Sequence, residues 1–159
     1  MSTIQLTTRI KAPIERCFLL SLSVDLHARS TAGTQERAVA GVTRGIMGLN
    51  DTVTWEAKHF GIRQKLTTRI SAYNAPGYFV SEMEKGVFKK IHHQHIFHQG
   101  NDGTVMTDIF VFEAPLGVLG RVADKLFLRK YMKKFLLKRN ETIKAIAESG
   151  EWLNYLKIA

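Results

Sequence analysis

The middle of the chain, between residues 51 and 115, constrains the fold most, because apolar and polar residues alternate there in strand-length runs separated by turns. The strongest turn is Gly100-Asn101-Asp102-Gly103. Residues that face each other across an antiparallel pair have a constant sum of residue numbers. A hairpin around this turn therefore pairs Phe97 with Met106, His95 with Asp108, His93 with Phe110 and Ile91 with Phe112.

Two earlier turns predict two further hairpins by the same arithmetic. A turn at His59-Phe60 places Val53, Trp55 and Ala57 opposite Leu66, Gln64 and Ile62. A turn at residues 74–77 places Ala72, Ile70 and Thr68 opposite Phe79, Ser81 and Met83, with Arg69 facing Glu82 on the other side. One continuous face of the predicted sheet thus collects most of the apolar side chains.

The flanking segments supply one more long strand, short helices and a long helix. Ile4, Leu6 and Ile10 alternate with polar residues, which predicts a half-buried strand over residues 3–11. Ala12-Pro13 then begins one or two short helices that reach about residue 27. Residues 36–40 are a short strand candidate, and the glycine-rich segment 41–49 is typical of a mobile gate.

Residues 118–148 have a helical pattern with two overlapping apolar stripes. The first stripe consists of Leu119, Val122, Ala123, Leu126 and Phe127, and the second of Leu128, Met132, Phe135, Leu136, Ile143 and Ile146. A straight helix would keep one stripe toward the core, so the shift predicts a bend near residues 128–131.

Composition and length indicate one domain over residues 1–159. The chain is 45% hydrophobic, which is enough to close one core, and no stretch has the ~20 apolar residues of a membrane span. We see no apolar run of signal-peptide type and expect a cytoplasmic protein. Cys17 is the single cysteine, which excludes an internal disulfide and a four-cysteine zinc site, and we expect it to be a buried thiol.

Three segments resemble proteins of the START-like superfamily, also called SRPBCC, which includes Bet v 1-like proteins and polyketide cyclases/dehydrases. They are the opening at residues 10–18 (IKAPIERCF), DTVTWEA at residues 51–57, and DIFVFEAPLG at residues 108–117. The last two are similar to a bacterial subgroup labelled cell-division-inhibitor-like. The resemblance covers nearly the whole chain and implies an α+β helix-grip fold. In that fold a curved antiparallel sheet of about seven strands surrounds a long C-terminal helix, and a cavity between them takes hydrophobic molecules such as lipids. No catalytic motif of the superfamily is present.

The interior face of the predicted sheet carries more polar groups than a dry core of this size usually holds. A few polar groups on an apolar wall would orient a ligand that has one polar end. Our candidate ligand-binding residues are Trp55, Gln64, Leu66, Phe79, Ser81, Met83, His93, His95, Phe97, Met106, Asp108 and Phe110.

The segment from Ile91 to His98 contains His93 and His95 on the interior face, and Asp108 lies opposite His95. A buried carboxylate is costly unless it is paired, so a His95–Asp108 contact is predicted. Its simplest interpretation is a mutually satisfied polar pair in a partly wet cavity. A second interpretation is catalysis, with Asp108 orienting the ring and His95 moving a proton. A third is a metal site of His93, His95 and Asp108, which lacks a clear fourth ligand, so we assign no metal and no cofactor.

The formal net charge of +9 is concentrated in the last predicted helix. Nine Lys or Arg between Arg121 and Lys144 stand against Asp124 and Glu141. Such helices are usually solvated outer faces, and an anionic membrane surface around Arg129, Lys130, Lys133 and Lys134 is the alternative. The aromatic residues do not form the stacking pattern of a single-strand reader, so we do not expect a nucleic acid partner.

These observations favour a non-catalytic protein that binds or carries a small hydrophobic or amphipathic molecule. A cyclase or dehydratase using His95 and Asp108 is one alternative, and an adaptor acting through the basic helix is the other. Phosphate loops, nucleophile elbows and paired zinc ligands are absent from the sequence.

Overall fold

The computed structural model describes residues 1–59, 61–115 and 127–156. Its strands are β1 (Ser2–Ile10), β2 (Arg37–Gly41), β3 (Thr52–His59), β4 (Ile62–Asn74), β5 (Tyr78–Lys85), β6 (Lys90–Gln99) and β7 (Thr104–Glu113). Its helices are α1 (Ile14–Ser21), α2 (Val24–Ser30) and α4 (Arg129–Glu148), with short 3-10 turns η1 (Ala32–Thr34) and η3 (Gly150–Asn154). The predicted order of elements is confirmed in the part of the chain that these ranges cover.

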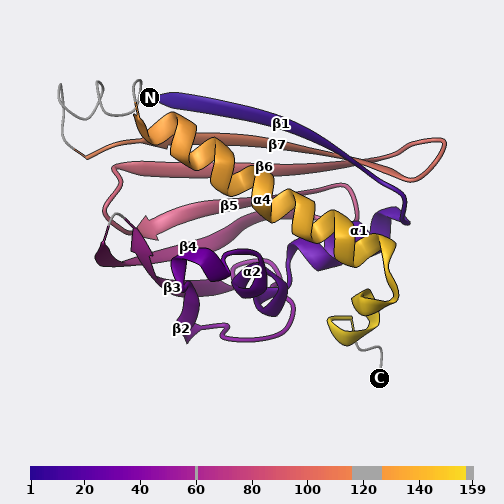
Figure 1. Cartoon of the computed structure of the whole chain (residues 1–159), viewed down its shortest axis with the longest axis horizontal. Coiled ribbons are helices and arrows are strands. Elements are labelled where there is room, and N and C mark those ends of the chain that lie inside the picture. The colour runs from indigo at the N-terminus through magenta and orange to yellow at the C-terminus, as the bar shows by residue number, and fades with distance from the viewer. Residues whose placement is uncertain (60, 116–126, 157–159) are drawn as a thin grey trace.

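The seven strands form one antiparallel sheet in the order β1-β7-β6-β5-β4-β3-β2. The sheet curves, and α4 crosses its inner face, while α1 lies beneath the C-terminal half of α4 and α2 lies below its middle (Figure 1). The predicted helix-grip architecture is therefore confirmed. The inward side chains of β3 to β7 thus lie on the face that α1, α2 and α4 cover together.

The β6–β7 hairpin has the predicted register throughout. His95 faces Asp108, His93 faces Phe110, and Gly103 lies in the turn that precedes β7. Gly103 has φ +148°, and a Cβ there would lie 2.2 Å from the carbonyl oxygen of Ile10. Only glycine allows β7 to start so close to the end of β1.

The register of the β3–β4 hairpin differs by two from the prediction. Trp55 faces Leu66 and Ala57 faces Gln64, not the predicted Gln64 and Ile62. His59 pairs with Ile62, and Gly61 lies in the turn with φ +75°. The left-handed conformation favours glycine, so the turn lies one residue later than we expected. The alternation of faces survives because the shift is even.

The β4–β5 pair agrees with the prediction only on one side of a β-bulge. Ile70 faces Ser81, Thr68 faces Met83 and Arg69 faces Glu82, as predicted. The register then shifts between Ile70 and Ala72, so Tyr73 faces Phe79 and the predicted Ala72–Phe79 pair is wrong. A bulge adds one residue to one strand and cannot be read from a constant index sum.

The helices begin at residues that favour a helix start. Pro13 directly precedes α1, and the Ser23 hydroxyl accepts a hydrogen bond from the Leu26 amide, which caps α2. Residues 127 and 128 precede α4 in a wider, π-type turn, the kind of irregularity that marks bends in helices. Most of the first predicted stripe (Leu119, Val122, Ala123, Leu126) lies outside the described residues.

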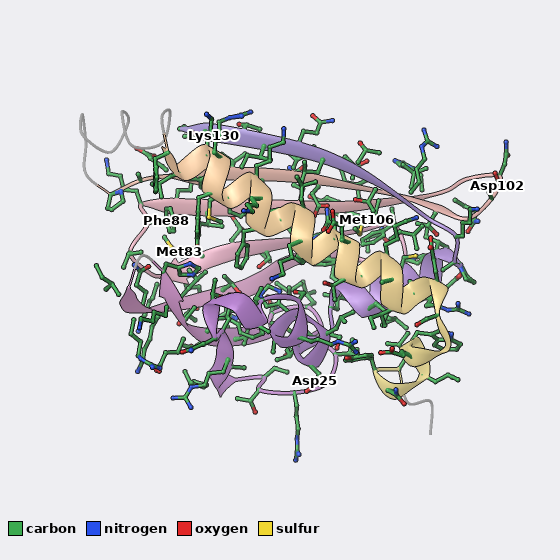
Figure 2. The ribbon with its side chains drawn as sticks, viewed as in Figure 1. Asp25, Met83, Phe88, Asp102, Met106 and Lys130 are labelled. Atoms are coloured by element: carbon green, nitrogen blue, oxygen red, sulfur yellow. The ribbon has the colours of Figure 1, made fainter. Side chains whose placement is uncertain are left out.

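Two groups of buried side chains hold the sheet and helices together. The larger surrounds Phe18 of α1, whose ring contacts Phe79 and Phe97 edge to face, and Cys17 is buried beside it. The smaller lies near the other end of the sheet and includes Ile4, Ile91, Phe110, Phe112 and Leu136. Met83 and Phe88 border this second group, away from Met106 (Figure 2).

Over the described ranges, no helix is long and apolar enough to cross a membrane.

Candidate ligand-binding site

A cavity of about 190 Å³ lies between the two groups of buried side chains, with the sheet on one side and α4 on the other. Its wall is largely apolar. Side chains from β3 to β7 meet Tyr131, Met132, Phe135, Leu136 and Arg139 of α4, and the junction of α1 and α2 closes one end. The strands contribute to this wall because their inward residues alternate with outward ones.

Most of the predicted ligand-binding residues line this cavity. They are Trp55, Gln64, Leu66, Phe79, Ser81, His93, His95 and Phe110. The other four do not reach it: Phe97 and Met106 pack in the core around Phe18, Met83 borders the second group, and Asp108 lies behind the histidine rings. Contact of any of these residues with a ligand stays a prediction.

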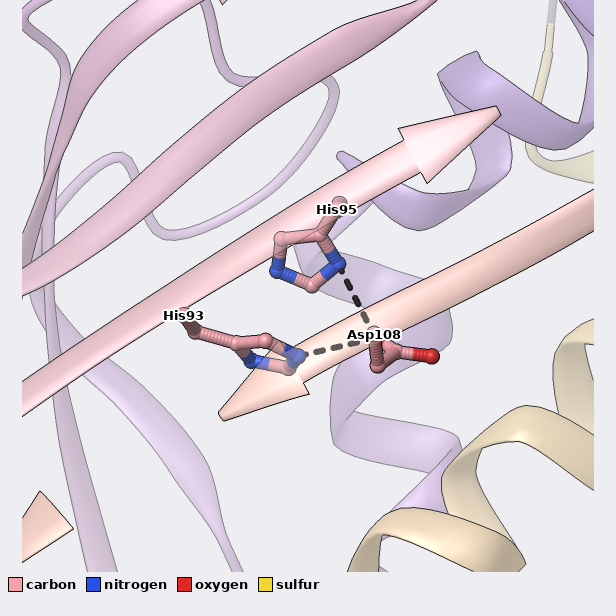
Figure 3. Close-up of side chains that lie close together, drawn as sticks. All are labelled: His93, His95 and Asp108. Atoms are coloured by element: carbon pink, nitrogen blue, oxygen red, sulfur yellow. Dashed lines mark hydrogen bonds and ion pairs between the residues drawn. The ribbon is translucent and has the colours of Figure 1, made fainter. Parts of the chain in front are cut away.

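Asp108 is the centre of a buried polar cluster at the inner wall of the cavity. Its side chain has 0% exposure. Its Oδ1 accepts a hydrogen bond from His93 Nε2 at 2.8 Å, and its Oδ2 accepts one from Asn140 Nδ2 at 2.7 Å. His93 and His95 come from β6 and Asp108 from β7, and both rings point toward the carboxylate (Figure 3). Paired in this way, the carboxylate is stable in the interior.

Arg139 completes the cluster from α4. Its Nη1 donates to Asn140 Oδ1 at 3.0 Å and lies 3.5 Å from Asp108 Oδ1. Sequence reasoning placed Arg139 among the solvated basic residues of the last helix and overlooked Asn140. The signal was present, because both residues fall between Leu136 and Ile143 at the three- and four-residue spacing of the buried face.

The predicted contact between His95 and Asp108 is present, but it is not the mutually satisfied pair of the simplest interpretation. The two residues face each other, but His95 Nδ1 stays 3.4 Å from Oδ1 and makes no hydrogen bond with any described residue. His93, diagonally across the pair, makes the short hydrogen bond instead. The His95 ring lies flat against Phe79, with ring centres 4.1 Å apart and an interplanar angle of 14°.

Burial decides the charges of the cluster. Burial lowers the pKa of His93 and lowers that of His95 well below the ordinary value, so both rings are neutral at neutral pH. For Asp108, burial acts to raise the pKa, but the neighbouring rings and Arg139 outweigh it and hold the pKa well below its ordinary value. The cluster therefore contains one carboxylate, one guanidinium and two neutral imidazoles.

The same residues do not form a good metal site. The nearest ligand atoms of His93, His95 and Asp108 lie within 4.8 Å of one another. However, both Asp108 oxygens already accept hydrogen bonds, and the Arg139 cation lies 3.5 Å from one of them. A metal ion would have to displace these donors and sit beside a fixed positive charge, so the donor set favours protein hydrogen bonds over a metal.

A second set of polar contacts lies elsewhere around the cavity. His27 Nε2 is 2.9 Å from Glu36 Oε1, and the His27 ring packs on Trp55 with ring centres 4.4 Å apart. His59 Nδ1 is 2.6 Å from the Tyr131 hydroxyl, which joins the end of β3 to the first turn of α4. Burial lowers the pKa of His59. Trp55 was among the predicted ligand-binding residues, whereas His27, Glu36, His59 and Tyr131 were not. His59 and Tyr131 are 72 residues apart, so strand pairing alone does not bring them together.

The loop that follows β2 is fastened beside the cavity. Met47 is buried and lines the cavity, and its amide donates to the Leu22 carbonyl at 3.0 Å. The Val24 amide donates to the Gly45 carbonyl at 2.9 Å, and Asp25 accepts from the Gly45 amide at 2.8 Å. If this loop acts as the predicted gate, its opening must break these hydrogen bonds.

No family model matches the sequence, and no curated protein matches it. Solved structures do match. Among them is the protein TTHA0849 from Thermus thermophilus, with a TM-score of 0.72, 16% identity, and coverage of 92% of this chain and 99% of that chain.

Two further matches come from the Bet v 1-like proteins. Major latex-like protein 151 from Panax ginseng has a TM-score of 0.69 and 16% identity, with 93% of this chain and 98% of that chain covered. Ara h 8.0201 has a TM-score of 0.67 and 13% identity, with 92% and 97% covered. At these identities the likeness concerns the fold, and the chain has the START/Bet v 1-like helix-grip fold that its sequence predicted.

Proposed function

We propose that this protein binds a small amphipathic molecule in the cavity between the sheet and α4. The observation that carries the proposal is the cavity itself, about 190 Å³ of space walled by apolar side chains with one buried polar cluster. Such a site fits a molecule with an apolar body and a polar end. Entry of the apolar body would remove its surface from water, and the polar end would be oriented by the cluster around Asp108.

Binding can be tested with two complementary measurements. Native mass spectrometry of protein purified without detergent would reveal a retained ligand, and calorimetric titration with 1-octanol would measure the affinity for a simple amphipath. We expect at least one of them to show binding with one molecule per chain. If neither a retained ligand nor octanol binding is found, the proposal is wrong.

A cavity-filling variant locates the binding site. Ala57 is buried and lines the cavity, so Ala57→Leu places additional carbon atoms in the space that a ligand would use. We expect the affinity for octanol to fall by about tenfold or more, because the leucine side chain would occupy volume that octanol needs. The matched control is Ala145→Leu, the same change at an exposed position of α4. Equal affinity in both variants would place the bound octanol elsewhere.

A catalytic function has one specific observation in its favour. The His93–Asp108 hydrogen bond has the arrangement of a general base and the carboxylate that orients it, and the lowered pKa of His93 leaves the ring unprotonated at neutral pH. The sequence-based hypothesis assigned the proton transfer to His95. His93→Gln and His95→Gln, compared on any substrate that is turned over, would separate the two assignments, and full activity in both would remove the hypothesis.

Docking on an anionic membrane surface is supported by the outer side of α4. Lys130, Lys133, Lys134 and Lys138 are exposed there, and Leu137 keeps 41% of its surface exposed beside them. Basic side chains near a bilayer are attracted by acidic lipids. Co-sedimentation with vesicles that is indifferent to the fraction of acidic lipid would remove this alternative.

A further inference from the structure

Arg139 is a buried cation whose hydrogen-bonding capacity is only partly used. Its side chain is 5% exposed, and it lines the cavity. A guanidinium carries five N–H donors in a planar fork. Within the described ranges, the hydrogen bond that Arg139 makes runs from Nη1 to Asn140, which leaves Nε and Nη2 without a protein acceptor.

The negative charge nearest to Arg139 is also shared with other groups. Asp108 lies 3.5 Å from Nη1 but makes its short hydrogen bonds to His93 and Asn140. The two histidines that border the same space are uncharged at neutral pH, because burial lowers their pKa. The unused Arg139 donors are not sealed from the cavity as His95 Nδ1 is, so an acceptor that enters the cavity can reach them.

We infer that the Arg139 guanidinium is the head-group subsite of the cavity and that the ligand carries a carboxylate. The unused Nε and Nη2 donors match two carboxylate oxygens, a pairing that is strong and geometrically specific. The apolar part of the ligand would lie along Leu66, Trp55 and Phe135, which line the same cavity. This inference rests on the proposed function and adds the chemical class of the ligand.

The test compares octanoate with 1-octanol, which share a chain length and differ in the head group. Calorimetric titration of the wild-type protein at neutral pH should show that octanoate binds at least about tenfold more tightly than octanol. Charge-assisted hydrogen bonds to Arg139 would supply this additional affinity. Arg139→Gln should reduce that preference to within about twofold while octanol still binds. Lys134→Gln removes an exposed cation from the same helix and should leave the preference unchanged.

The outcomes separate this inference from the function on which it rests. Equal affinity of the wild-type protein for octanoate and octanol would overturn the carboxylate subsite and leave apolar ligand binding intact. A full preference in Arg139→Gln would also overturn it. Failure of both compounds to bind would overturn both proposals. If Arg139→Gln does not fold, Arg139→Lys keeps the charge without the planar fork, and it should lose most of the preference.

Discussion

His93 donates to Asp108 from a ring nitrogen 2.8 Å away, and the carboxylate that it reaches has no exposed surface. The same carboxylate accepts from Asn140, so β6, β7 and α4 are joined through one side chain. Because α4 is the wall of the cavity opposite the sheet, these hydrogen bonds tie the two walls of the cavity together. Stability and ligand binding should therefore both respond to changes at Asp108.

Replacing Asp108 by alanine should be strongly destabilising. The change leaves Arg139 as an unpaired buried cation and removes the acceptor of His93 and Asn140. Breaking one side of a buried ion pair typically costs about 3–5 kcal/mol of the free energy of unfolding. Urea denaturation would measure the loss. Asp102→Ala, at the exposed tip of the β6–β7 hairpin (Figure 2), is the control and should change stability by less than about 0.5 kcal/mol. If both variants lost a similar amount of unfolding free energy, the cluster around Asp108 would not stabilise the fold.

The stability of the protein should fall as the pH falls below about 6.5, the ordinary pKa of histidine. Burial lowers the pKa of His93 and His95, so the unfolded chain binds protons that the folded protein does not. Above that pH both rings are neutral in the folded and the unfolded chain, and stability does not depend on them. Below it, each ring lowers the free energy of unfolding by up to about 1.4 kcal/mol per pH unit. Urea denaturation at a series of pH values would measure this slope.

A variant of His95 tests the origin of the slope. His95→Phe keeps a flat ring against Phe79 and removes a group that can be protonated, and no hydrogen bond of Nδ1 is lost. The loss of stability between neutral and mildly acidic pH should become smaller. His98→Phe changes an exposed histidine of the same strand and should follow the wild type. A slope that is unchanged in His95→Phe would show that His95 does not contribute.

Phe18 is the side chain on which the larger buried group depends. It is 1% exposed, and its ring contacts Phe79, Phe97 and Tyr73 edge to face. Phe18→Ala should lower the free energy of unfolding by about 3–5 kcal/mol, the usual cost of a large cavity in a core. Leu153→Ala, at a position with 57% exposure, should have little effect. A loss below about 1 kcal/mol for Phe18→Ala, on the order of an exposed site, would contradict this packing.

The hydrogen bond between His59 and the Tyr131 hydroxyl should slow ligand exchange. It joins the end of β3 to the start of α4 at 2.6 Å, and both residues line the cavity. Tyr131→Phe removes the hydroxyl and keeps the ring, so we expect a loss of about 1 kcal/mol in stability and a faster dissociation of octanol. Stopped-flow displacement would measure the rate. An unchanged dissociation rate would show that the ligand does not pass between these two residues.

Alternation and turn chemistry were sufficient to predict the strands and hairpins, and the resemblance to the START-like superfamily supplied the helix-grip arrangement. The Gly100–Gly103 turn alone fixed the complete β6–β7 register and brought His95 and Asp108 to opposing positions. The predicted register was wrong where a bulge added a residue to a strand or where a turn lay one residue later. The bulge between Ile70 and Ala72 and the turn at Gly61 are choices of the backbone that side-chain periodicity does not encode.

The candidate site was only partly predictable for a different reason. Alternation gives the face of a residue but not its partner, so it could not decide between His93 and His95 as the donor to Asp108. Arg139 and Asn140 were missed because charged and amide side chains are normally assigned to the solvated face of a helix. Their place in the stripe between Leu136 and Ile143 was the available signal.

The most direct test is a crystal structure of the protein grown in the presence of octanoate. We expect electron density for the alkyl chain between the sheet and α4, with the carboxylate within hydrogen-bonding distance of the Arg139 guanidinium. A cavity closed by Trp55 and Phe135, or octanoate bound only on the outer surface, would contradict it.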